Sequence, residues 1–227
     1  EWHRIERADA IARGEVRPDA RPIESVVWVE RPLDVGAPTE FDVYRPGADL
    51  RIAEASVGAD GLALGAETSL VAGCGLALGP ADVREPAVSW DGTRIAFAAR
   101  SSSTEPLRLY WVRPDGTGCE PIPGAASPVD VENGIAVHDF DPAFAPDGTL
   151  VFASTRGHLD RTAYDYAGPT RTPARLEPNA NLYVLDPGLG SVRQLTFLLD
   201  QELQPSFMGD GHVVYTAEKR AEDFHML

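Results

Sequence analysis

DFDPAFAPDGTLVFASTR, residues 139–156, is the stretch of sequence that decides the fold. Residues 85–100 (EPAVSWDGTRIAFAAR) and residues 204–219 (QPSFMGDGHVVYTAEK) align with residues 141–156 without a gap. Each copy has a proline, an apolar pair, an Asp-Gly turn and then a β-rich segment. Asp-Gly suits the tight turn of a hairpin, because glycine accepts the positive φ that the turn needs. The sequence therefore contains an internal repeat whose centre is a β-hairpin.

A second pattern follows each hairpin and supplies the remaining strands. Residues 107–116, residues 181–188 and, further upstream, residues 40–50 each contain a β-rich segment that leads into a turn. The anchor prolines of the repeat, Pro86, Pro142 and Pro205, lie 56 and 63 residues apart. Four-stranded units that repeat in this way are typical of a β-propeller, here with inserted loops. We therefore predict an all-β protein, a β-propeller made of four-stranded antiparallel blades.

The ring of blades is predicted to be incomplete in this chain. Two blades are complete, at residues 85–121 and 141–196, and a last blade begins at Gln204 and stops after two strands. A partial blade precedes them, with strands expected near residues 25–30, 40–45 and 50–55. A closed ring needs about four to eight blades, so we expect the missing termini or a neighbouring chain to complete it. Residues 25–227 thus form the propeller portion, and residues 1–24 form an N-terminal arm or linker.

Composition excludes several classes of partner. The chain has 20 Lys and Arg against 35 Asp and Glu, a net charge of −15. Binding to nucleic acid or to an anionic membrane surface needs clustered Lys and Arg, so neither is expected. No run of 18 apolar residues occurs, so no membrane span is predicted. The chain begins at Glu1 rather than Met, and we expect it to be processed or excised from a longer protein.

The two cysteines, Cys74 and Cys119, fit no cofactor motif. They lack the Cys-x-x-Cys spacing of zinc and redox sites, and no Cys-x-x-Cys-His motif for haem attachment occurs. Two free, partly buried thiols are the interpretation that we favour from the sequence. A disulfide that joins neighbouring sheets of an exported protein is the alternative.

The repeat also resembles a known family. Residues 139–156 follow the pattern Asp-x-x-Pro-x-Phe-x-Pro-Asp-Gly of the TolB-type, WD-like propeller repeat. Residues 82–100 and 139–156 together look most like the propeller of the hydrazine synthase α-subunit group, and the resemblance covers roughly residues 25–218. It implies a bacterial protein of the periplasm or the extracellular space. It implies haem only if the parent protein carries haem motifs outside this segment.

A group of acidic residues lies next to the anchor prolines, on the face that also holds the loops between the second and third strands. The group consists of Glu85, Asp139, Asp141 and Glu202, with Arg84 and His138 among them. One interpretation is an acidic rim at the channel mouth that holds a cationic ligand or Ca²⁺, the latter at Asp139 and Asp141. The other, which we favour, is that Asp141 and its equivalents cap turns and hydrogen-bond the backbone between blades.

The longest insertion, residues 157–180, is predicted to lie on the same face. A loop of this length is often functional, and its candidate contact residues are His158, Asp160, Tyr164 and Tyr166. It is interpreted either as a binding lid or as an inert cover. His138, His158 and Asp160 could also converge on a metal, although solvated or turn-bonded histidines are the simpler interpretation. The aromatic residues of the repeat, among them Trp28, Trp90 and Trp111, are expected in the core between blades.

No motif for nucleophilic catalysis or phosphate binding occurs, so no catalytic residue is predicted in this segment. We expect an exported bacterial TolB-like propeller that acts as a scaffold and binds a protein partner or a small ligand on its loop face. The alternative is the propeller domain of a larger multihaem redox enzyme, similar to hydrazine synthase α, whose haem motifs lie outside this chain.

Overall fold

A computed structural model of the chain describes residues 23–33, 41–58, 61–77, 79–132, 135–157, 180–186, 188–197 and 201–218. Within these ranges the regular structure is β, with one short 3-10 helix and no α-helix. No helix in the same ranges is long and apolar enough to cross a membrane.

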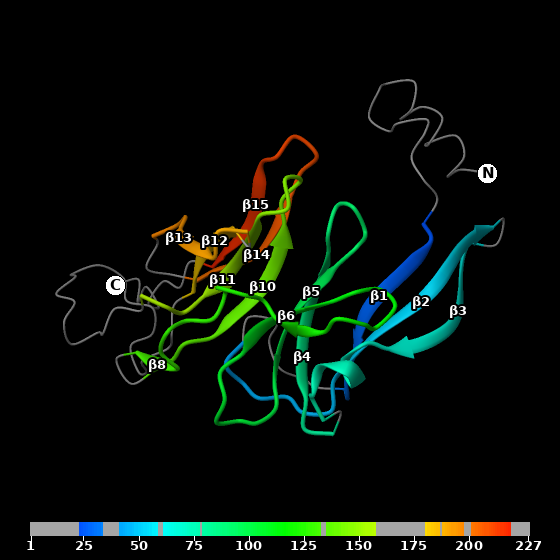
Figure 1. Ribbon diagram of the computed structural model, residues 1–227, viewed down its shortest axis with the longest axis horizontal. Coiled ribbons are helices and arrows are strands. Elements are labelled where there is room, and N and C mark those ends of the chain that lie inside the picture. The colour runs from blue at the N-terminus through cyan, green and yellow to red at the C-terminus, as the bar shows by residue number, and fades with distance from the viewer. Residues whose placement is uncertain are drawn as a thin grey trace, which may run out of the picture. The chain divides into compact units, whose positions relative to one another are not determined.

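The repeated segments form antiparallel sheets whose strands follow one another in chain order (Figure 1). The first blade contains β4 (Asp82–Val88), β5 (Ile95–Arg100), β6 (Arg108–Val112) and β7 (Glu120–Pro121). The second blade contains β10 (Asp139–Phe144), β11 (Leu150–Ser154), β12 (Asn181–Asp186) and β13 (Ser191–Gln194). The third blade has β14 (Gln201–Phe207) and β15 (Val213–Glu218), and a small hairpin, β8 (Val131–Glu132) with β9 (Ile135–Ala136), precedes the second blade. β10 packs against β4 and β5 of the first blade and against β14 of the third. The predicted four-stranded antiparallel blades are confirmed for the first and second blades, and the two-stranded start of the last blade is also present.

The leading sheet differs from the predicted partial blade. It consists of β1 (Ser25–Glu30), β2 (Asp49–Gly58) and β3 (Gly61–Ser69), and it is followed by the 3-10 helix η1 (Val71–Cys74). The strand expected at residues 40–45 is wrong, since residues 41–45 are turn and irregular chain. Phe41 is buried and stacks on Phe140, and the Arg45 N–H donates to the Asp82 carboxylate at 3.1 Å, so packing and side-chain bonds hold this segment in place of a ladder.

Two compact units divide the described chain. Residues 23–26, 53–58 and 61–67, which are parts of the leading sheet, belong to the smaller unit. All other described residues, including the three blades, belong to the larger unit. The junctions between the three blades lie entirely within the larger unit.

A β-bulge coincides with each anchor proline. In all three blades the pairing of the first two strands gains one residue on the first strand, between Arg84 and Ala87 in the first blade and at the equivalent places in the others. The residue before each proline has a positive φ, +40° at Glu85, +50° at Asp141 and +53° at Gln204. Non-glycine residues rarely adopt this conformation. The repeat therefore imposes a distinctive backbone at the position that carries two of the predicted site residues.

Much of the expected aromatic core is present, but Trp28 is only partly buried and outside the core clusters, and Trp90 is exposed. Phe97 and Phe152 are fully buried, and Trp111 is 8% exposed. Trp90 is 53% exposed, so its predicted place in the core is wrong. It precedes Asp91-Gly92 at the tip of the β4–β5 hairpin, outside the strands that bury the other rings.

Cys74 and Cys119 form a disulfide, with their Cα atoms 4.8 Å apart. The interpretation as two free thiols is therefore wrong, and the disulfide itself is confirmed. Cys74 ends η1 and Cys119 precedes β7, so the bond ties the chain that follows the leading sheet to the outer part of the first blade. Sequence separation alone gave no indication of this proximity.

Removing this disulfide should lower the free energy of unfolding by about 3–4 kcal/mol, because the bond closes a loop across 45 residues and so restricts the unfolded chain. Urea unfolding of the Cys74→Ala/Cys119→Ala double variant against the oxidised protein measures this loss. The protein treated with reductant serves as the control and should match the double variant. Equal midpoints for the oxidised protein and the double variant would contradict the prediction.

Candidate functional site

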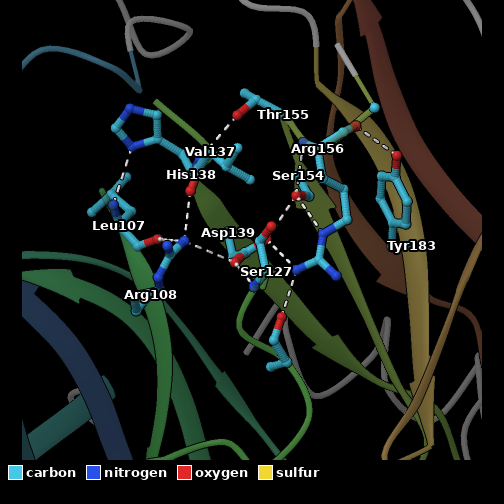
Figure 2. Close-up of polar contacts among 12 residues, drawn as sticks. Leu107, Arg108, Ser127, Val137, His138, Asp139, Ser154, Thr155, Arg156 and Tyr183 are labelled. Atoms are coloured by element: carbon cyan, nitrogen blue, oxygen red, sulfur yellow. Dashed lines mark hydrogen bonds and ion pairs between the residues drawn. The ribbon is translucent and has the colours of Figure 1, made fainter. Parts of the chain in front are cut away.

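Asp139 is the centre of a buried polar network that joins the first blade to the second (Figure 2). Its side chain is fully buried. Arg156 Nη2 donates to Oδ1 at 2.6 Å, Ser154 Oγ donates to the same oxygen at 2.6 Å, and Arg108 Nη1 donates to Oδ2 at 3.1 Å. Arg108 belongs to β6 of the first blade, and the Asp139 N–H donates to the Leu107 carbonyl at 3.0 Å. Both guanidinium groups thus neutralise one carboxylate at the junction of two sheets.

The same junction recurs between the second and third blades with different residues. Glu202 occupies the place of Asp139 two residues before the bulge, and its N–H donates to the Ala180 carbonyl at 2.9 Å. Asn181 Nδ2 donates to Glu202 Oε2 at 2.9 Å, as Arg108 does to Asp139. Glu202 is 1% exposed. A buried acid that bonds the third strand of the preceding blade is therefore a repeated joint.

The first blade holds its buried acid one position earlier. Asp82 accepts bonds from Arg84 and Arg100 on its own blade, and from the Arg45 N–H. Burial raises the pKa of Asp82, but the hydrogen bond and charge of Arg84, the Arg45 N–H and the charge of Arg100 outweigh it and leave the pKa below its ordinary value. The carboxylate is therefore ionised, and both of its oxygens accept hydrogen bonds.

Asp139→Asn should destabilise the protein by about 3–5 kcal/mol, because it leaves two largely buried guanidinium groups without their shared carboxylate. Asp130→Asn is the matched control: Asp130 bonds the same Arg108, but its side chain is 78% exposed, so the loss should stay below about 1 kcal/mol. Chemical denaturation of both variants measures the difference. A similar small loss in both would refute a structural role for Asp139.

The bulge residues form a second row of contacts across the blades. Asp141 is 5% exposed, and its Oδ2 accepts the Gln204 N–H of the third blade at 2.8 Å. On the other side it lies against Glu85 of the first blade. Burial raises the pKa of Asp141 well above its usual value, and the charge of Glu85 and a hydrogen bond with Glu85 raise it further. Burial and the neighbouring Glu85 therefore favour the protonated form of Asp141.

The stability of the protein should depend on the proton of Asp141. The folded state holds it to a higher pH than the unfolded chain does, so the free energy of unfolding falls as pH rises from about 4, the unfolded pKa, towards the raised folded pKa. Asp141→Asn keeps an acceptor for Gln204 and a donor for Glu85, so it mimics the protonated acid. Unfolding measured between pH 4 and 8 should show the variant gaining stability over the native protein as pH rises. A constant difference between the two curves would exclude a raised pKa of Asp141.

His138 is also enclosed. It is 4% exposed, its Nδ1 accepts the Leu107 N–H at 3.1 Å, and its ring meets Phe41 edge-on. Burial first, and then the charges of Arg100, Arg84 and Arg108, lower its pKa to about 3. The imidazole is therefore neutral, and its Nδ1 already accepts a hydrogen bond from the first blade.

The structure thus places the predicted site residues in two groups. Asp139, Asp141, Glu202 and His138 are buried and bonded within the protein, and Glu85 is half-buried beside Asp141; they do not form an open acidic rim. In the described ranges no three His, Cys, Asp or Glu side chains gather in a way that could hold a metal ion. His158, Asp160, Tyr164 and Tyr166 lie outside the described residues, as do residues 1–22 of the predicted arm.

An open cleft lies at the other end of the hairpins, between the Asp-Gly turns of the first two blades. It has a volume of about 300 Å³ and is lined by Ser89–Asp91, Thr93, Arg94 and Phe144–Gly148. The Trp90 indole N–H donates to the Phe144 carbonyl at 2.7 Å, which holds the exposed ring across the gap between the blades. No sequence pattern predicted this cleft. Its one signal was Trp90 itself, which stands where the other repeats have Pro146 and Gly209.

Comparison with known proteins supports the fold. No protein-family model and no curated protein sequence matches the chain. Among solved structures it is similar to hydrazine synthase of Kuenenia stuttgartiensis, with 14% identity and a TM-score of 0.55 over 86% of this chain and 28% of that one. TolB from Acinetobacter baumannii gives 17% identity and a TM-score of 0.50 over 90% and 38% of the two chains. A puromycin hydrolase gives 17% identity and 0.50 over 88% and 24%.

These likenesses show the fold alone, because the identities are so low. At that level the resemblance to the TolB and hydrazine synthase propellers is confirmed, and the chain is a portion of a β-propeller. The chain spans less than two fifths of the length of each of these three proteins.

Proposed function

We propose that the protein is an exported, TolB-like β-propeller scaffold that binds a protein partner at the Asp-Gly end of its blades. The observation that carries this proposal is the cleft between the turns of the first and second blades. An aromatic ring that is exposed yet held in one orientation loses little conformational freedom on binding, and Trp is among the residues that dominate protein interfaces. Trp90 meets both conditions.

The blades give this cleft a rigid base. Its two walls belong to different sheets, and the buried joint at Asp139 fixes those sheets to each other. Binding surfaces on a preformed base avoid the cost of ordering on association. The acids at the opposite end of the strands are bonded internally, which favours the Asp-Gly end as the place of recognition.

Export is supported by the Cys74–Cys119 disulfide, because such bonds persist in oxidising compartments. The second candidate remains a propeller domain of a larger multihaem redox enzyme, in which haem would be bound by residues outside this chain. Bound Ca²⁺ remains a proposal without a matching cluster in the described ranges.

Purification of the full-length protein from its native host tests the proposal. We expect it outside the cytoplasm, with Cys74 and Cys119 unreactive to thiol reagents until reductant is added, and with a co-purifying protein that Trp90→Ala releases. Tyr215→Ala, which removes an exposed ring on β15, is the control and should retain the partner. Free thiols in a cytoplasmic protein, or a haem absorption band with stoichiometric iron, would overturn the proposal.

A further inference from the structure

The cleft combines one exposed aromatic face with two fixed carboxylates. Asp91 and Asp147 lie at equivalent turns of the first and second blades, and both line the cleft with Trp90. Asp91 Oδ1 accepts Ser89 Oγ at 2.6 Å and the Thr93 N–H at 3.0 Å, and Asp147 Oδ1 accepts the Thr149 N–H at 3.0 Å. In each case the turn itself holds the carboxylate through a single oxygen.

The second oxygen of each carboxylate is available to a ligand. Oδ2 of Asp91 and Oδ2 of Asp147 have no hydrogen-bond partner within the described part of the chain. The hydrogen bond from Ser89 and those from Thr93 lower the pKa of Asp91 to about 2, and the bonds from Thr149 lower that of Asp147. Both groups are therefore anions at any physiological pH.

Trp90 is not explained by the needs of its turn. The equivalent positions hold Pro146 and Gly209, which are ordinary turn residues, and those hairpins form without an aromatic ring there. An indole that is 53% exposed leaves apolar surface in contact with water, and its hydrogen bond to Phe144 directs the ring across the cleft. A ring face beside carboxylates is an arrangement that attracts a cation.

One positively charged side chain, Arg94, also lines the cleft and offsets part of the charge of the two carboxylates. The Arg94 guanidinium lies over the Trp111 ring, 4.0 Å from its centroid, and so is already stacked within the protein. Two carboxylates against one guanidinium leave the cleft acidic. The net charge of −15 draws cations towards the whole molecule.

We propose that this cleft binds an arginine side chain of the partner protein, with the guanidinium stacked on Trp90 and hydrogen-bonded to Asp91 and Asp147. This inference rests on the function proposed above, since it specifies the partner group for the same site. Arginine fits better than lysine, because its planar guanidinium stacks on indole and donates in a fork to carboxylates.

Titration with a short peptide tests the inference directly. Ac-Gly-Arg-Gly-NH₂ is added to ¹⁵N-labelled protein while the indole N–H signals of its four tryptophans are followed by NMR. The signal that is absent from Trp90→Ala identifies Trp90. We expect this signal to shift and saturate in the millimolar range, and the neutral isostere with citrulline in place of arginine to bind about tenfold more weakly or worse.

Two variants of equivalent turns distinguish binding at the cleft from nonspecific attraction of the cationic peptide to the acidic protein. Asp147→Asn keeps the turn bonds through its amide oxygen, and it should weaken binding of the arginine peptide by about two- to fivefold. Asp210→Asn removes the same charge from the equivalent turn of the third blade, where Gly209 replaces the ring, and it should leave the affinity unchanged. Equal losses in both variants, equal binding of the citrulline peptide, or no shift of Trp90 would each overturn the inference. A partner that still co-purifies in a Trp90-dependent manner would then leave the proposed function intact.

Discussion

The rest of the structure depends on the buried carboxylate of Asp139. A propeller blade is a sheet whose faces must pack on neighbours, and hydrophobic packing alone is non-directional. Asp139 adds direction, because its two oxygens face Arg108 on one blade and Arg156 and Ser154 on the other. A buried carboxylate without partners would be costly, so the two blades are constrained to one relative placement.

The two ends of the strands differ in what their residues contact. At the end near the anchor prolines, the positive φ of Glu85, Asp141 and Gln204 brings acidic and amide groups of successive blades into contact. At the other end, the Asp-Gly turns satisfy their own hydrogen bonds and leave Trp90 and two carboxylate oxygens exposed. The joints hold the blades together, and the turns carry the proposed binding site.

The sequence predicted the blades because Asp-Gly turns, prolines and β-rich runs act locally and recur in register. It failed at residues 41–45, which have strand-like composition but are held by the burial of Phe41 and the bond from Arg45 to Asp82. It identified Asp139, Asp141 and His138 as notable residues, but the burial that makes them structural comes from the packing of β10 against its neighbours. The Cys74–Cys119 bond and the cleft at Trp90 depend on contacts between distant segments, which no local pattern reports.

The central claim is that Asp139 makes the first two blades one cooperative unit, which in turn fixes the cleft between their turns. Amide hydrogen exchange of Asp139→Asn tests it most directly. We predict that amides of β6 in the first blade and of β10 in the second lose protection together, since Arg108 and the Leu107 carbonyl bond Asp139 across the junction. Faster exchange confined to the second blade, with β6 as protected as in the native protein, would contradict the claim.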